Sequence, residues 1–158
     1  MPNEDRAGHL YWSLIEPYWL TLNETWDLGS SSFLAQLRKV PLKVRHVYSA
    51  HWCQSEVFNG GLYQFFFNTT GLLAPDALDG FRGIGLQEWS EVLDEAMRYF
   101  GTPYPRERKL RLVKLPEARS RNREDWDPFL ALDERFNKWA DEEHDRWELA
   151  ADSYAAST

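Results

Sequence analysis

The residues most able to do chemistry lie about a third of the way along the chain, around Cys53. Glu56 follows this single cysteine by three residues, and His46 and His51 precede it closely. A thiol close to a histidine base is the arrangement of a nucleophilic active site. A lone cysteine on a largely apolar helix is more typical of a small core residue. We favour the core interpretation and expect no catalytic residues here.

The histidine spacing also argues against a metal site. His46 and His51 are five residues apart, and that spacing does not place both rings on one face of a helix. One cysteine allows neither an internal disulfide nor a zinc site made of cysteines. No H-E-x-x-H or G-x-S-x-G motif occurs, and Gly60-Gly61 lacks the lysine and hydroxyl residue of a phosphate-binding loop. The sequence therefore predicts a protein that is not an enzyme and needs no metal or cofactor.

Residues 56–71 form the most distinctive stretch of the chain. Gly60-Gly61 predicts the end of a helix, because glycine accepts the left-handed conformation of a helix C-cap. The amide side chains of this stretch lie among Phe65, Phe66 and Phe67, and an unpaired buried amide costs about 1–3 kcal/mol. We expect these amides to tie backbone ends together as a scaffold. The alternative is a small-ligand pocket or catalytic centre formed by Glu56, Asn59, Gln64 and Asn68.

The elements that position these groups are expected to be helices, because apolar residues recur at helical spacing in nearly every segment. The predicted helices cover residues 9–25, 30–38, 41–58, 62–68, 76–84, 86–100 and 106–115. A last helix of about 20 residues starts at Pro128, with Asp127 as its cap. Ser30, Ser31 or Ser32 is expected to cap the second helix. The helix over 41–58 is predicted to be central. The fold class is therefore all-α, a single irregular bundle of about six to eight helices.

The composition fits one globular domain. The length of 158 residues predicts a single helical domain over 1–158, and 43% hydrophobic with 15% aromatic residues predicts a well-filled core. The uncharged stretch 57–75 contains too many polar residues and glycines to span a membrane. The acidic start of the chain is not followed by an apolar segment, and a single cysteine fits a reducing compartment. We therefore expect a cytoplasmic protein with no membrane partner.

Charge is distributed unevenly along the chain. The formal net charge is −7, yet residues 104–123 hold eight bases and two acids, whereas residues 124–158 hold eleven acids and three bases. The overall balance disfavours a general nucleic-acid binder, so no direct nucleic-acid partner is expected. The basic block of residues 104–123 leaves room for a local phosphate contact, or it pairs with the C-terminal acids.

The stretch 56–71 resembles the bacterial DNA-mimic-protein domain family, which carries the run E-x-x-N-G-G-x-x-Q-F-F-x-N-x-x-G. The matching residues are Glu56, Asn59, Gly60, Gly61, Gln64, Phe65, Phe66, Asn68 and Gly71. Phe100-Gly101 with Pro103 and Pro105 is similar to a glycine-proline junction of the family, and Phe129 to Phe136 is similar to its F-x-x-L-D-x-x-F helix. The resemblance covers about residues 40–150. It implies an all-α fold without catalysis, and a protein partner, because the family takes its name from an acidic member that occupies the DNA-binding surface of a transcription factor.

A DNA mimic must present carboxylates where phosphates would lie, and two segments carry acids at helical spacing. These candidate partner-binding residues are Glu88, Glu91, Asp94 and Glu95 in the segment 86–100, and Asp133, Glu134, Asp141, Glu142, Asp145, Glu148 and Asp152 in the last helix. Acids on one helix face stand about 5–6 Å apart, whereas a DNA strand places a phosphate about every 3.4 Å. One helix is therefore too sparse. The second stripe must come from this chain or from the other copy in a homodimer.

The expected partner is a basic DNA-binding protein. Two other interpretations fit the same charges. An immunity or antitoxin-type inhibitor of a nuclease would also present acidic helices, and acids opposite an apolar stripe are often only a solvated helix face.

Overall fold

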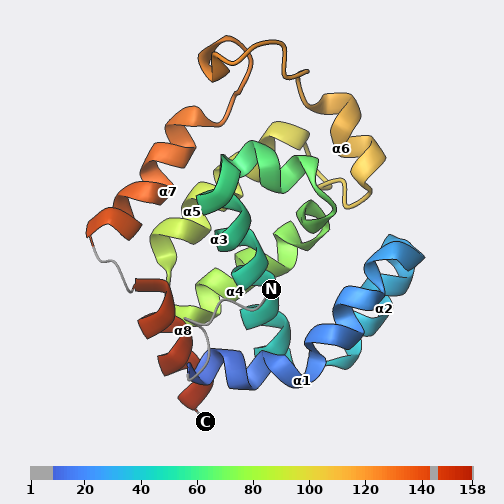
Figure 1. Ribbon diagram of the computed structural model, residues 1–158, viewed down its shortest axis with the longest axis vertical. Helices are drawn as coiled ribbons and strands as arrows, with labels where there is room; N and C mark the ends of the chain where they lie inside the picture. The colour runs from blue at the N-terminus through green and yellow to red at the C-terminus, as the bar shows by residue number, and fades with distance from the viewer. Residues whose placement is uncertain (1–8, 143–145, 158) are drawn as a thin grey trace.

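The described part of the protein is built from helices. A computed structural model describes residues 9–142 and 146–157, the side chains of 140–142 excepted (Figure 1). The α-helices are α1 (Leu10–Glu24), α2 (Ser30–Lys39), α3 (Leu42–Phe67), α4 (Ala74–Ile84), α5 (Gln87–Met97), α6 (Arg108–Lys114), α7 (Leu130–Glu142) and α8 (Arg146–Ala156). Short 3₁₀ helices are η2 (Trp26–Leu28), η3 (Thr69–Leu73), η4 (Arg98–Phe100) and η5 (Arg123–Asp125). No strand occurs in these ranges, so the predicted all-α fold is confirmed.

Helix α3 runs through the middle of the molecule, with α1, α4, α6 and α7 packed around it (Figure 1). Its side chains are buried on more than one face, as the sequence predicted for a central helix. Helix α4 packs tightly against it at Gly80, where a Cβ would lie only 2.4 Å from the His46 carbonyl oxygen. The missing side chain therefore allows the two helix backbones to come into contact.

The buried hydrophobic side chains of the described helices form one cluster that reaches from α1 to α8. Aromatic contacts join neighbouring elements within it. Trp89 of α5 stacks on Phe136 of α7 with ring centroids 4.6 Å apart, and its indole N–H donates to the Phe136 carbonyl at 3.1 Å. Helices α5 and α7 are thereby held side by side.

Some predicted helix boundaries are wrong. The N-cap of α2 is Gly29 rather than a serine, and the Ser30 hydroxyl donates instead to the Glu107 carboxylate. The predicted last helix is divided into α7 and α8. Helix α7 packs on α5 and α3, whereas α8 packs on α1 and α4. Trp147 of α8 meets Tyr11 of α1 edge-on at 5.4 Å. The apolar residues of the two halves thus face different parts of the core, which local periodicity does not reveal.

Candidate functional site

The pair Gly60-Gly61 breaks α3 into two parts, as the sequence predicted. Gly60 has φ −152° and ψ 17°, and Gly61 has φ 81° and ψ 176°, so the helical backbone resumes only at Leu62. A positive φ with extended ψ is open to glycine and costly for other residues. A Cβ on Gly61 would also lie 2.6 Å from a carboxylate oxygen of Asp133.

Asp133 caps the second part of α3. Its Oδ1 accepts the Leu62 backbone N–H at 2.8 Å, and the residue is only 6% exposed. Asp133 therefore lies in the interior, and the prediction that it is a partner-binding acid on the surface is wrong. The F-x-x-L-D-x-x-F pattern contained the residue, but nothing local indicated its partner 71 positions away.

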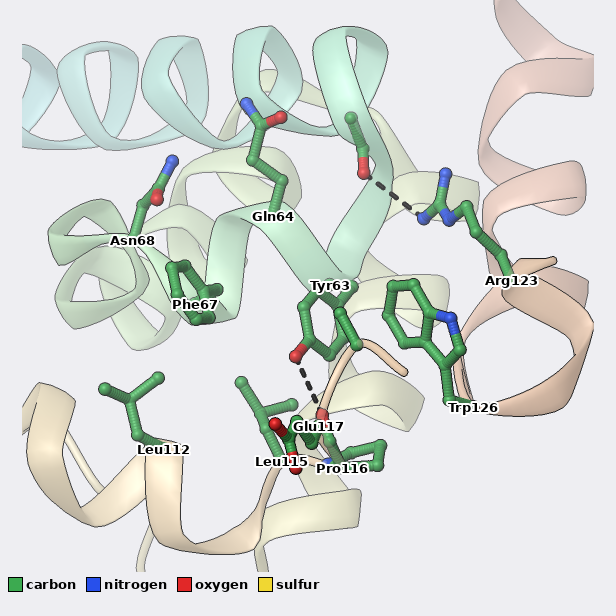
Figure 2. A pocket seen from close by; sticks show the side chains of 12 residues that line it. Tyr63, Gln64, Phe67, Asn68, Leu112, Leu115, Pro116, Glu117, Arg123 and Trp126 are labelled. Atoms are coloured by element: carbon green, nitrogen blue, oxygen red, sulfur yellow. Dashed lines mark hydrogen bonds between the residues drawn. The ribbon is translucent and has the colours of Figure 1, made fainter. Parts of the chain in front are cut away.

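Arg123 joins this cap to the glycine break. Its Nη2 donates to the Gly60 carbonyl at 3.2 Å, the contact dashed in Figure 2, and to Asp127 at 2.5 Å. The same nitrogen lies 3.7 Å from Oδ2 of Asp133. Burial raises the pKa of Asp133 to about 6; the Asp127 charge adds to this, whereas the Leu62 N–H and Arg123 oppose it. The predicted helix start at Pro128 is two residues too early, since α7 begins at Leu130, but Asp127 does bind the chain just before it, where its Oδ1 accepts the Phe129 N–H at 2.9 Å.

The polar side chains of residues 56–71 mostly bind one another. Glu56 accepts hydrogen bonds from Gln64 at 2.6 Å, from Asn68 at 3.1 and 3.3 Å, and from Thr70 at 2.9 Å. We call these four residues the Glu56 network. Asn59 in turn donates to Gln64 at 3.3 Å. The network ties the first part of α3 to its second part and to η3, which fits the scaffold interpretation. Sequence analysis missed Thr70, because it lies in η3, beyond the end of the helix that carries Glu56.

Arg111 fixes the end of α3 from within the core. It is fully buried, and its guanidinium donates to the carbonyl oxygens of Phe66 and Asn68, both at 2.9 Å. Two further carbonyls, of residues 105 and 106, accept from the same side chain at 3.3 and 2.5 Å. Burial lowers the pKa of Arg111. A Cβ on Gly71 would lie 2.8 Å from Arg111 Nε, so that motif glycine makes room for the guanidinium. The sequence placed Arg111 in the basic block, without any sign that it is buried.

An open cleft of about 740 Å³ lies between the second part of α3 and α6 with the loop after it (Figure 2). Tyr63, Phe67 and Trp126 give it an aromatic side, and the Tyr63 hydroxyl donates across it to the Pro116 carbonyl at 2.7 Å. Gln64 and Asn68 line the cleft with their stems, while their amide groups turn away toward the first part of α3. The amides therefore serve the Glu56 network rather than converge on this cleft.

The acids of α5 are bonded mainly to arginines. Glu88 pairs with Arg146 of α8 at 2.9 Å, and Glu95 pairs with Arg135 of α7 at 2.7 Å. Asp94 pairs at 2.7 Å with Arg98, four residues along the chain. The exposed Glu91 accepts only a weak hydrogen bond from Gln87 at 3.3 Å. The acidic side of α5 thus faces both C-terminal helices and carries interspersed positive charge.

The acids predicted for the last helix do not share one face. Glu134 of α7 is exposed, and Glu148 of α8 is half-buried. Asp152 lies against α1, where it binds the His9 ring at 2.8 Å and the Tyr11 N–H at 3.0 Å. The split between α7 and α8 accounts for this separation. Three further predicted residues are not covered: Asp141 and Glu142 end α7 with side chains outside the described part, and Asp145 lies outside the described residues.

The nucleophile suggested by Cys53 has no accessible thiol. Cys53 is fully buried, and burial raises its pKa, so it is a small core residue. His46 binds the Tyr154 hydroxyl at 2.8 Å, and burial lowers its pKa. Within residues 9–142 and 146–157, no three His, Cys, Asp or Glu side chains gather in a way that could hold a metal ion. No described helix combines the length and apolar character needed to cross a membrane.

The fold and its contacts define a class of small helical protein with a glycine-broken central helix, fixed by buried polar groups, beside helices rich in acids. Residues 38–157 match the family described as DMP19-like protein, and the chain belongs to this family, which is one of DNA-mimic proteins. The resemblance found in the sequence is thereby confirmed. The comparisons with curated proteins and with solved structures gave no match.

Proposed function

We propose that this chain is a non-enzymatic interaction protein that acts as a DNA mimic and occupies the DNA-binding surface of a basic partner. Membership of the DMP19-like protein family supports the class. The location that we propose for the contact surface rests on the packing of α5 on α7, where Trp89 stacks on Phe136. Because one acidic helix is too sparse to imitate a phosphate row, this adjacency supplies the second stripe from the same chain.

The proposed contact surface centres on exposed carboxylates of these two helices. Glu91 and Glu134 are exposed and form no ion pair within the described residues, and Glu95 is about half exposed beside Arg135. The neighbouring arginines interrupt the negative field. We therefore expect the surface to select its partner by the pattern of charges as well as by their sum.

Affinity capture from a cell lysate tests the proposal. The immobilised chain is washed at low and high salt, and the retained proteins are identified by mass spectrometry. We expect a basic DNA-binding protein that is lost at high salt and displaced by duplex DNA. The identity of the retained protein also separates a transcription factor from a nuclease.

Two matched triple variants locate the contact. Glu91→Gln with Glu95→Gln and Glu134→Gln should weaken capture at least tenfold, because charge-steered association depends on these carboxylates. The control removes three exposed acids of α1 and η2, through Glu16→Gln, Glu24→Gln and Asp27→Asn, and should leave capture unchanged. Equal capture by both triple variants, or a partner indifferent to DNA, would overturn the proposal.

A further inference from the structure

A second hollow, of about 400 Å³, opens beside the Glu56 network, and Asn68 lines both it and the cleft of Figure 2. Trp26 and Trp52 contribute indole rings to it, Glu56 a carboxylate and Arg108 a guanidinium. We call it the indole hollow. Opposite charges and two indoles in one small concavity are the features of a ligand site for a charged organic molecule.

Glu56 gives the indole hollow a negative charge without a free acceptor position. Each carboxylate oxygen already accepts two hydrogen bonds from the Glu56 network. A carboxylate has about four lone-pair sites, so the network fills them. No described Lys, Arg or His forms an ion pair with Glu56. A cation in the hollow would gain its charge attraction, but the Glu56 carboxylate would offer an N–H group no vacant lone pair.

The two indoles are held by other rings. Trp52 stacks on Trp19 with centroids 5.3 Å apart, and Trp26 stacks on Phe33 at 4.2 Å. Trp26 and Trp52 meet nearly at right angles, 6.2 Å apart. Indoles attract cations through their ring electrons and need no N–H from the ligand. Rings already fixed by neighbours lose little freedom when a ligand binds.

Arg108 supplies the opposite charge. Its guanidinium lies 4.9 Å from the centre of the Phe67 ring, and its Nε donates to the Phe67 carbonyl at 2.6 Å. The side chain forms no ion pair with Glu56 or with any other described acid, although it lines the same hollow as Glu56. Its two terminal nitrogens can therefore donate to a carboxylate in the paired geometry that arginine favours.

We propose that the indole hollow binds a small zwitterion of the betaine class, a quaternary ammonium joined to a carboxylate. The methylated ammonium lies between the indoles on one side and Glu56 on the other, where the carboxylate supplies charge but no vacant lone pair. The carboxylate lies at Arg108. A primary ammonium, as in an ordinary amino acid, binds less well because its N–H groups lose water partners that the saturated Glu56 carboxylate does not replace. This site is independent of the protein-binding surface proposed for α5 and α7.

Titration calorimetry of the full chain with three ligands tests the site. Glycine betaine is the probe, and 3,3-dimethylbutanoate has the same shape with carbon in place of the charged nitrogen. We expect the carbon analogue to bind about tenfold more weakly, since it loses the cation–ring and charge attraction. Choline keeps the ammonium and lacks the carboxylate, so it should bind less tightly than betaine.

The variant Arg108→Gln isolates the carboxylate contact, and its exposed position leaves the core untouched. It should weaken betaine binding severalfold and leave choline binding unchanged. Arg119→Gln, another exposed arginine of the basic block, is the control and should change neither. Thermal unfolding verifies that each chain is folded. No betaine binding to the folded chain, equal binding of betaine and its carbon analogue, or an Arg108→Gln variant that binds betaine normally would each overturn the proposal.

Discussion

The break in α3 and the acidic side of α5 use the same residue types in opposite ways. Asp133 at the break and Arg111 at the end of α3 are buried and bind backbone N–H and carbonyl groups. On the acidic side of α5, Glu95 binds Arg135 of α7, and both side chains remain about half exposed. When a buried charged side chain is removed, the backbone groups that it bound are left without a partner. When one member of a surface ion pair is removed, water binds the other. Position thus separates charges that hold the fold from charges that are free to bind a partner.

The largest effect is expected from Arg111→Met. Four carbonyl oxygens lose their donor in the core, and breaking such a buried charged contact costs about 3–5 kcal/mol. Urea unfolding measures the loss. Arg119→Met, on the exposed part of the basic block, should change the free energy of unfolding by less than about 0.5 kcal/mol. Similar values for the two variants would remove the distinction between buried charges that bind the backbone and exposed charges.

Gly61→Ala comes next, at about 2–4 kcal/mol, because alanine strains the φ of 81° and its Cβ meets the Asp133 carboxylate at 2.6 Å. Gly85→Ala is the matched comparison. Gly85 also has a positive φ, of 91°, but its Cβ would point into open space. The cost at Gly85 should be about 1 kcal/mol. If thermal unfolding gives the same loss of stability for both variants, the close contact between residue 61 and Asp133 adds nothing to the cost.

Asp133→Asn should change how stability depends on pH. The carboxyl pKa is about 6 in the folded chain against 3.8 ordinarily, so the folded state binds the proton more tightly than the unfolded state. The wild-type chain therefore loses stability from this group as pH rises from about 4 to above 6, by on the order of 2 kcal/mol. Asparagine keeps an oxygen for the Leu62 N–H and does not titrate. Its stability relative to wild type should rise between pH 4 and pH 8, and a constant difference would contradict the assignment.

The smallest effect is expected at the ion pair between α5 and α7. Glu95→Gln, Arg135→Gln and the double variant form a cycle whose coupling should be below about 1 kcal/mol, as for other exposed pairs. Chemical denaturation measures it. A larger coupling would mean that this surface also holds the fold together.

Local signals in the sequence predicted most of the fold. Apolar periodicity located the helices, and Gly60-Gly61 gave the break, because both act within a few residues. The candidate site depended on contacts between distant segments. Asp133 and Leu62 lie 71 positions apart, and Arg111 and Phe66 lie 45 apart. Charge alone could not separate a buried cap from a surface acid, and periodicity alone could not show that α7 and α8 pack on different neighbours.

The contact between α1 and α8 has a consequence for the order of folding. His9 and Tyr11 bind Asp152 across more than 140 residues of chain. Contacts of such long range form late, because the ends of a long loop must meet first. On the ribosome, α3 to α5 can assemble as they emerge, whereas Tyr11 acquires its contact with Trp147 only after α8 has been synthesised. Until then Tyr11 stays uncovered on its α8 side, although Trp19 of the same helix can already stack on Trp52 of α3, and such uncovered aromatic surface favours aggregation during synthesis.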